Sequence, residues 1–297
     1  MSRFQTILAA LDFSEHSGTA LDQAIALAHA SGATLHLLHA YELPFGAMPI
    51  YDVQVPQSML EAVRDAAARR IEKARAKAEA AGVACETHLT TSPPTPAIVD
   101  TAKTVKADLI VMGTRGLSGF QHVLLGSNAE RTARLAPCPV LTLKTAAPTT
   151  AKFARILAPV DFSTEGDAAV KLAIDLAREH GGEVHLLHAY DVPAGVAMGY
   201  GGAIPQSVFD GIEAGARASM EKACGPLQRA GVPFKTHLVM GSTTDAILDT
   251  AKAEGADVIV MGTHGRRGFH HLLLGSVAER TLRLAACPVL TFRSQAE

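Results

Sequence analysis

The feature that most constrains this chain is a glycine pattern that occurs twice at a fixed distance. The pattern Gly-x2-Gly-x9-Gly-Ser begins at Gly113 and again at Gly262, 149 positions later. The same offset relates Asp12 to Asp161. Each copy is long enough to bury its own core. The sequence therefore predicts two copies of one domain, at residues 1–144 and 155–297, joined by a linker at 145–154.

Each copy alternates short apolar runs with helical patterns. Runs such as Thr6–Leu11, Thr34–Ala40 and Ala107–Met112 end in polar turns and are typical of buried parallel strands. Strands that alternate with helices indicate right-handed β-α-β units. We expect an α/β fold class, with two repeated, open-twisted and mainly parallel five-stranded sheets that carry helices on both faces.

Composition argues against several functional classes. The 27 Lys and Arg against 29 Asp and Glu, a net charge of −2, lack the basic excess of nucleic-acid-binding proteins. The apolar runs are too short for a membrane span or a signal peptide. The four cysteines fit neither a disulfide framework nor zinc-ligand spacing. We expect a cytoplasmic protein with reduced thiols and no nucleic-acid or membrane partner.

The residues at the predicted strand ends indicate a nucleotide site in each copy. Ligands of parallel sheets bind at the carboxyl ends of strands, where the chain order reverses. Asp12 ends the first strand and Gly113 follows the fourth, so neighbouring ends would form two walls of one crevice. Gly126-Ser127 opens a helix, whose free N–H groups and dipole favour phosphate. Asp12 could accept hydrogen bonds from a ribose hydroxyl or a base amine.

Other nucleotide motifs are absent from the sequence. Neither Gly-x4-Gly-Lys-Ser/Thr nor a Gly-x-Gly-x-x-Gly after a first strand occurs. The loops also lack the phosphate-binding lysine, so backbone N–H groups and Mg²⁺ would have to offset the phosphate charge. We find no repeated carboxylate pair or Ser/His/Asp order that would mark a general base. The sequence predicts no catalytic residue and at most slow ATP hydrolysis.

These motifs together resemble the universal stress protein family. The Gly-x2-Gly-x9-Gly-Ser loop after a Val-Met strand, Asp-Phe-Ser, Leu-Leu-His and the closing Cys-Pro-Val-Leu occur in order, twice, over nearly the whole chain. The resemblance implies a tandem form of that family, with a Rossmann-like fold similar to adenine nucleotide alpha hydrolases, ATP binding and a role in the stress response. Carried over by position, it implies nucleotide-binding residues Ala10, Asp12, Ala40, Met112, Gly113, Gly116, Gly126, Ser127 and Asn128 in the first copy, and Pro159, Asp161, Ala189, Met261, Gly262, Gly265, Gly275, Ser276 and Val277 in the second.

The two copies do not fit the family pattern equally. The family often has proline two residues before the strand-end aspartate and valine after the loop serine. Pro159 and Val277 fit, whereas the first copy has Ala10 and Asn128. The second copy is therefore the closer match.

Structural roles compete with ligand binding at several positions. Ser127-x-x-Glu130 and its repeat also fit helix capping boxes. Asp12 and Asp161 could simply cap the first helix of each copy. The glycines could be turn residues.

The histidines do not indicate a metal site. His36 and His39, three apart in a predicted strand, face opposite sides and cannot chelate one ion. His122 and the pair His270-His271 lack supporting cysteines or carboxylates. We predict no bound metal other than the Mg²⁺ that accompanies ATP.

Three functions remain open from the sequence. The first is an ATP-binding regulatory protein, the second a scaffold that binds no ligand or another small molecule, and the third a slow ATPase or autophosphorylating protein. The protein partner, the stress and the oligomeric state stay open, a homodimer of tandem chains included.

Overall fold

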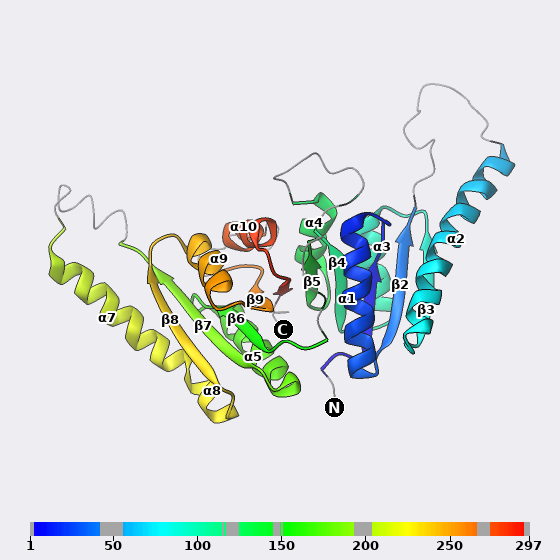
Figure 1. Cartoon of the computed structure of the whole chain (residues 1–297). Coiled ribbons are helices and arrows are strands. Elements are labelled where there is room, and N and C mark those ends of the chain that lie inside the picture. The colour runs from blue at the N-terminus through cyan, green and yellow to red at the C-terminus, as the bar shows by residue number, and fades with distance from the viewer. Residues whose placement is uncertain are drawn as a thin grey trace, which may run out of the picture. The chain divides into compact units, whose positions relative to one another are not determined.

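The computed structural model describes residues 3–41, 56–114, 116, 125–144, 149, 151–192, 204–265 and 274–293. The chain divides into two compact units, Met1–Lys152 and Phe153–Glu297 (Figure 1). His122, His270, His271 and half of the predicted linker lie outside the described residues.

The first unit alternates strands and helices from end to end. Its strands are β1 (Thr6–Ala10), β2 (Thr34–Ala40), β3 (Cys85–Thr90), β4 (Leu109–Gly113) and β5 (Val140–Leu143). Its helices are α1 (Glu15–Ser31), α2 (Gln57–Ala80), α3 (Pro94–Thr104) and α4 (Ser127–Leu135).

The second unit repeats this order, with one further short helix. Its strands are β6 (Arg155–Pro159), β7 (Glu183–Tyr190), β8 (Phe234–Met240), β9 (Val258–Gly262) and β10 (Val289–Phe292). Its helices are α5 (Thr164–His180), α7 (Gln206–Ala223), α8 (Gly225–Ala230), α9 (Thr243–Ala253) and α10 (Ser276–Leu284).

Both sheets are parallel and have the same strand order. In the first unit β1 pairs with β2 and β4, and these pair with β3 and β5. In the second unit β6 pairs with β7 and β9, and these pair with β8 and β10. The chain order thus reverses beside β1 and beside β6. The predicted α/β fold and the neighbouring positions of the first and fourth strands are confirmed.

Helices cover both faces of the first sheet. Leu8, Ile110 and Met112 pack with Ile98 of α3 and Ala129 of α4 in one buried cluster. Gly113, the next strand residue, faces the start of α1, so α1 lies on the opposite face. Burying one such large apolar side chain contributes about 1.5–3 kcal/mol.

The first helix of each unit begins and ends with local signals in the sequence. Ser14 Oγ accepts a hydrogen bond from Ser17 N–H, and Ser163 Oγ accepts one from Gly166 N–H. The helices end at Gly32 and Gly181, with left-handed φ values of 70° and 66°. These caps fix where the preceding strand-end loops enter the helices.

The described helices are mostly amphipathic, and none of them is both long enough and apolar enough to cross a bilayer.

Candidate functional site

A cavity of about 280 Å³ lies at the carboxyl ends of the strands in the first unit. This volume is close to the lower end, roughly 300 Å³, of pockets that hold small molecules. All nine residues predicted for the first copy line it: Ala10, Asp12, Ala40, Met112, Gly113, Gly116, Gly126, Ser127 and Asn128. Leu11, Ser17, Leu38, Pro94, Ile98, Thr114, Leu125 and Ala129 complete the lining. The chain order reverses at this point of the sheet, as expected for a ligand crevice.

Asp12 is fixed by the residues that follow it. Its Oδ1 accepts hydrogen bonds from Ser14 N–H at 3.0 Å and Ser14 Oγ–H at 2.6 Å. Ser14, not Asp12, is the N-cap of α1, so the interpretation of Asp12 as the cap is wrong. Asp12 instead orients the residue that caps the helix, and its carboxylate remains in the wall of the cavity.

The glycines of the loop are required by contacts within the protein. A Cβ on Gly116 would lie 2.6 Å from Asp12 Oδ2, and one on Gly113 would lie 2.8 Å from His16 Cβ. Real Cβ atoms do not approach other atoms so closely. The sequence argument attributed these glycines to close approach of a ligand or to turns. At Gly113 and Gly116 the immediate reason is packing of the loop against α1 and Asp12.

The two ends of the loop are joined to each other. Gly126 N–H donates to the Thr114 carbonyl at 2.9 Å. Gly126 is also the N-cap of α4, with Ser127 as the first helical residue. The capping-box interpretation of Ser127 and Glu130 is therefore wrong, because Ser127 lies one position too far into the helix. The serine lines the cavity instead.

Asn128 is held by a neighbouring helix. Its Oδ1 accepts a hydrogen bond from Thr95 Oγ1 of α3 at 3.2 Å. The departure from the family valine thus forms a polar contact between α3 and α4 at the edge of the cavity.

Thr114 is a lining residue that the predicted nucleotide-binding set omitted. It is only 3% exposed, and its Oγ1 has no hydrogen-bond partner within the described part of the chain. A buried hydroxyl without a partner costs free energy, on the order of 1–3 kcal/mol. A polar ligand in the cavity could supply the partner. The repeat offered a signal, because Thr263 occupies the matching position.

The second unit places its nine predicted residues at the corresponding strand ends. Pro159 ends β6, Ala189 lies near the end of β7, Met261 and Gly262 end β9, and Ser276 and Val277 begin α10. A Cβ on Gly265 would again lie 2.6 Å from an aspartate oxygen, Oδ2 of Asp161. Gly275 N–H donates to the Thr263 carbonyl at 2.9 Å, as in the first unit. The backbone of the crevice is therefore repeated.

His39 and His188 are structural residues, as their positions in the strands predicted. His39 Nδ1 lies 2.7 Å from the Leu11 carbonyl, and His188 Nδ1 lies 2.8 Å from the Val160 carbonyl. Burial lowers the pKa of His39, although the bond to Leu11 raises it.

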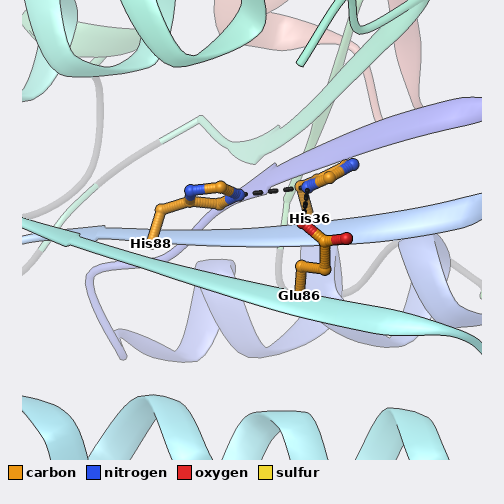
Figure 2. Close-up of side chains that lie close together, drawn as sticks. All are labelled: His36, Glu86 and His88. Carbon is orange, nitrogen blue, oxygen red and sulfur yellow. Dashed lines mark hydrogen bonds and ion pairs between the residues drawn. The ribbon is translucent and has the colours of Figure 1, made fainter. Parts of the chain in front are cut away.

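His36 lies on the opposite face of β2 from His39, where its ring meets side chains of the neighbouring strand β3. Its Nδ1 lies 3.0 Å from His88 Nε2 and 3.5 Å from Glu86 Oε2. Figure 2 shows the three side chains together. Burial lowers the pKa of His36, Glu86 raises it, and His88 lowers it. The sequence argument considered His36 only with His39. It missed His88, although His88 and His237 follow the same 149-residue offset.

All four cysteines are free, in agreement with the absence of a disulfide framework in the sequence. Burial raises the pKa of the Cys138 thiol to about 12, so this thiol is protonated and unreactive near neutral pH.

The two units define a tandem parallel α/β protein with a cavity at the strand ends of the first unit and the same backbone contacts at the matching strand ends of the second. The sequence profile of the universal stress protein family matches residues 3–144 and again 152–293, so the chain belongs to this family.

Relatives match both the whole chain and one unit. A universal stress protein of Mycolicibacterium smegmatis is 27% identical over 297 residues, which cover 97% of this chain and 96% of that protein. One from Thermus aquaticus is 41% identical over 143 residues, 48% of this chain and 99% of that protein.

A solved structure shares the fold of the whole chain. The crystal structure of a universal stress protein from Archaeoglobus fulgidus has a TM-score of 0.73 at 22% identity, over 97% of this chain and 98% of that chain. A universal stress protein solved in complex with cAMP is 31% identical over 48% of this chain, with a TM-score of 0.35.

Proposed function

We propose that the crevice of the first unit binds an adenine nucleotide, ATP with Mg²⁺, and that the second unit binds one in the same way. Nucleotide binding then serves as a regulatory signal in the stress response. The observation that carries the proposal is the gathering of all nine predicted residues around one cavity, beside a helix start and the buried Thr114 hydroxyl, which has no partner among the described residues.

The charges around the cavity favour one orientation of the nucleotide. The start of α4 at Ser127 offers N–H groups and a positive dipole end, which attract phosphate. The Asp12 carboxylate repels phosphate but accepts hydrogen bonds from ribose hydroxyls. We therefore place the ribose beside Asp12 and the phosphates beside Ser127 and Thr114.

The lining residues favour binding over rapid turnover. Among the described lining residues, Asp12 is the single side chain with a carboxylate, imidazole or amine, and Ser14 holds one of its oxygens. General acid–base catalysis needs a group positioned to take or give a proton at the reacting atom. Asp12 at the ribose end lacks that position.

Calorimetric titration of the nucleotide-free chain with Mg²⁺ and ATP tests the proposal. We expect up to two ATP molecules per chain, and Asp12→Ala should remove binding in the first unit while leaving the second. Asp65→Ala, an exposed aspartate on α2, is the matched control and should bind as the wild type does.

Two outcomes would favour the other functions. Unchanged ATP affinity in an Asp12→Ala, Asp161→Ala double variant would favour the scaffold. Steady conversion of ATP to ADP that Gly275→Val abolishes would favour the slow ATPase. ADP, AMP and cAMP in parallel titrations would show whether the triphosphate is selected.

A further inference from the structure

Each unit carries a cluster of two histidines and one carboxylate away from the crevice, on the outer strand pair of its sheet. In the first unit the cluster is His36 of β2 with Glu86 and His88 of β3 (Figure 2). In the second unit it is His185 of β7, His237 of β8 and Glu254, which follows α9. In each cluster the three ligand atoms lie within 4.8 Å of one another.

The two histidine pairs have nearly the same nitrogen–nitrogen spacing, although their rings are tilted by 34° in the first unit and 8° in the second. His36 Nδ1 lies 3.0 Å from His88 Nε2, and His185 Nδ1 lies 3.1 Å from His237 Nε2. Two neutral imidazoles can share one hydrogen bond at this distance. The same separation is close to the roughly 3.3 Å between two nitrogen ligands of tetrahedral Zn²⁺, given Zn–N bonds of about 2.0–2.1 Å.

The carboxylate of each cluster is the strongest sign of a shared function, because the two units supply it from different elements. The repeat position of Glu86 is Lys235, and the repeat position of Glu254 is Val105. Yet Glu86 Oε2 lies 3.5 Å from His36 Nδ1, and Glu254 Oε2 lies 3.4 Å from His185 Nδ1. The repeats have thus changed the residue but retained a carboxylate oxygen at a similar distance from the buried histidine.

The second cluster also has an outer partner that fixes its ring. His185 Nε2 lies 3.0 Å from Glu183 Oε1, and His185 is only 1% exposed. A carboxylate can only accept, so Nε2 carries a proton, and in the neutral ring Nδ1 then presents its lone pair to the cluster. Histidines that bind metals commonly have such a carboxylate on the second ring nitrogen.

A route from solvent reaches the second cluster. A surface cavity of about 350 Å³ between β8 and α9 is lined by His237 and Glu254 together with Asp245 and Asp249. Acidic walls raise the local concentration of cations. In the first cluster Glu86 is exposed and His88 is partly exposed, so its ion would also have access to water.

We propose that these clusters are two sites for a divalent transition metal of the Zn²⁺ class, one on the outer strand pair of each unit. Two imidazoles and one carboxylate supply three protein ligands, and water completes the coordination. Lys235 Nζ lies 3.5 Å from Glu254 Oε2, so its charge weakens the second site relative to the first. The proposal does not depend on nucleotide binding.

Zinc titration of the metal-free, nucleotide-free full chain tests the proposal, with a chromogenic chelator as competitor. We expect two Zn²⁺ per chain, one in each of the variants His88→Gln and His237→Gln, and none in the double variant. Co²⁺ in place of Zn²⁺ should give the visible absorption of a four-coordinate site, lost in the same steps.

More conservative variants distinguish a loss of metal binding from a loss of folding. Glu86→Gln and Glu254→Gln should each weaken one site at least tenfold, while the thermal unfolding of the metal-free protein stays unchanged. Zn²⁺ should raise the unfolding temperature of the wild type but not of the double histidine variant.

Two controls separate the clusters from other histidines. His29→Gln, on the exposed end of α1, and a triple variant without His122, His270 and His271 should each keep both zinc ions. Absence of uptake by the wild type would overturn the proposal, as would full uptake by the double variant or a loss that follows the triple variant.

Discussion

The crevices of the two units share a backbone but differ in their side chains. In both units an aspartate supports the residue that caps the first helix, and a glycine stands where any Cβ would lie 2.6 Å from an oxygen of that aspartate. Around this frame Ala10 stands where the second unit has Pro159, and Asn128 where it has Val277. Both departures in the first unit line its cavity, and Asn128 bonds to Thr95. Main-chain geometry is thus more strongly constrained than the side chains at the rim.

The outer strand pairs show a different kind of divergence. There the histidines are retained, while the carboxylate moves from β3 in the first unit to the residue after α9 in the second. A side chain can be replaced from another element when only the position of its oxygen matters. The crevice offers no such freedom, since a packed glycine has no substitute.

The largest expected effect on ATP binding comes from replacing one loop glycine in each unit with alanine. Gly116→Ala and Gly265→Ala should each weaken ATP binding in their own unit by tenfold or more, because the new Cβ displaces the aspartate carboxylate. Calorimetric stoichiometry would measure this. Gly18→Ala, where a Cβ meets nothing within 4 Å, is the matched control. An effect in only one unit would show that the two crevices are not equivalent.

Reversing the charge of Lys235 should make the Zn²⁺ affinities of the two histidine clusters more similar. Lys235→Glu places a carboxylate at the repeat position of Glu86, and we expect Zn²⁺ to bind the second site at least tenfold more tightly. A unit charge about 4 Å away is worth several kcal/mol at an effective dielectric constant of about 20, so tenfold is a modest expectation. Chelator competition measures the affinity. Lys222→Glu on α7 controls for net charge, and an equal gain there would contradict the prediction.

Replacing the glycine that ends the first helix should lower the stability of both units equally. Gly32→Ala and Gly181→Ala force a left-handed conformation on alanine, and each should cost about 1 kcal/mol of unfolding free energy. Urea denaturation with hydrogen exchange would assign the loss to a unit. Gly211→Ala, inside α7, should have the opposite sign, since no positive φ or close neighbour opposes it. Unequal losses would mean that one terminus is strained by its surroundings.

The smallest expected effect is a pH dependence of the stability of the first unit. Burial lowers the pKa of His39 below its ordinary value of 6.5, so the folded state binds its proton less readily than the unfolded state. Stability from this group is complete above about pH 6.5 and is lost as the pH falls toward the folded pKa. Urea midpoints between pH 7.5 and 5.5 should fall less steeply in His39→Gln. An unchanged slope would exclude this source of pH dependence.

Local patterns predicted the strands well and the helix starts less well. Thr34–Ala40 was predicted with its observed ends, because an apolar run between turns is sufficient for a buried strand. The capping box at Ser127 failed because a tertiary bond from Gly126 to Thr114 fixes where the helix begins. The alternative role of Asp12 as a cap failed for a similar reason, since Ser14 takes that role two residues later.

The sequence by itself determined the repeat, the α/β alternation and the residues at the strand ends, because these follow from periodicity and spacing along the chain. Only the tertiary structure decided which side chains meet across strands. His36 and His88 are 52 residues apart and come together through the register of β2 with β3. The carboxylate beside each pair is set by packing at the sheet edge, where two different elements can bring an oxygen to a similar distance from the buried histidine.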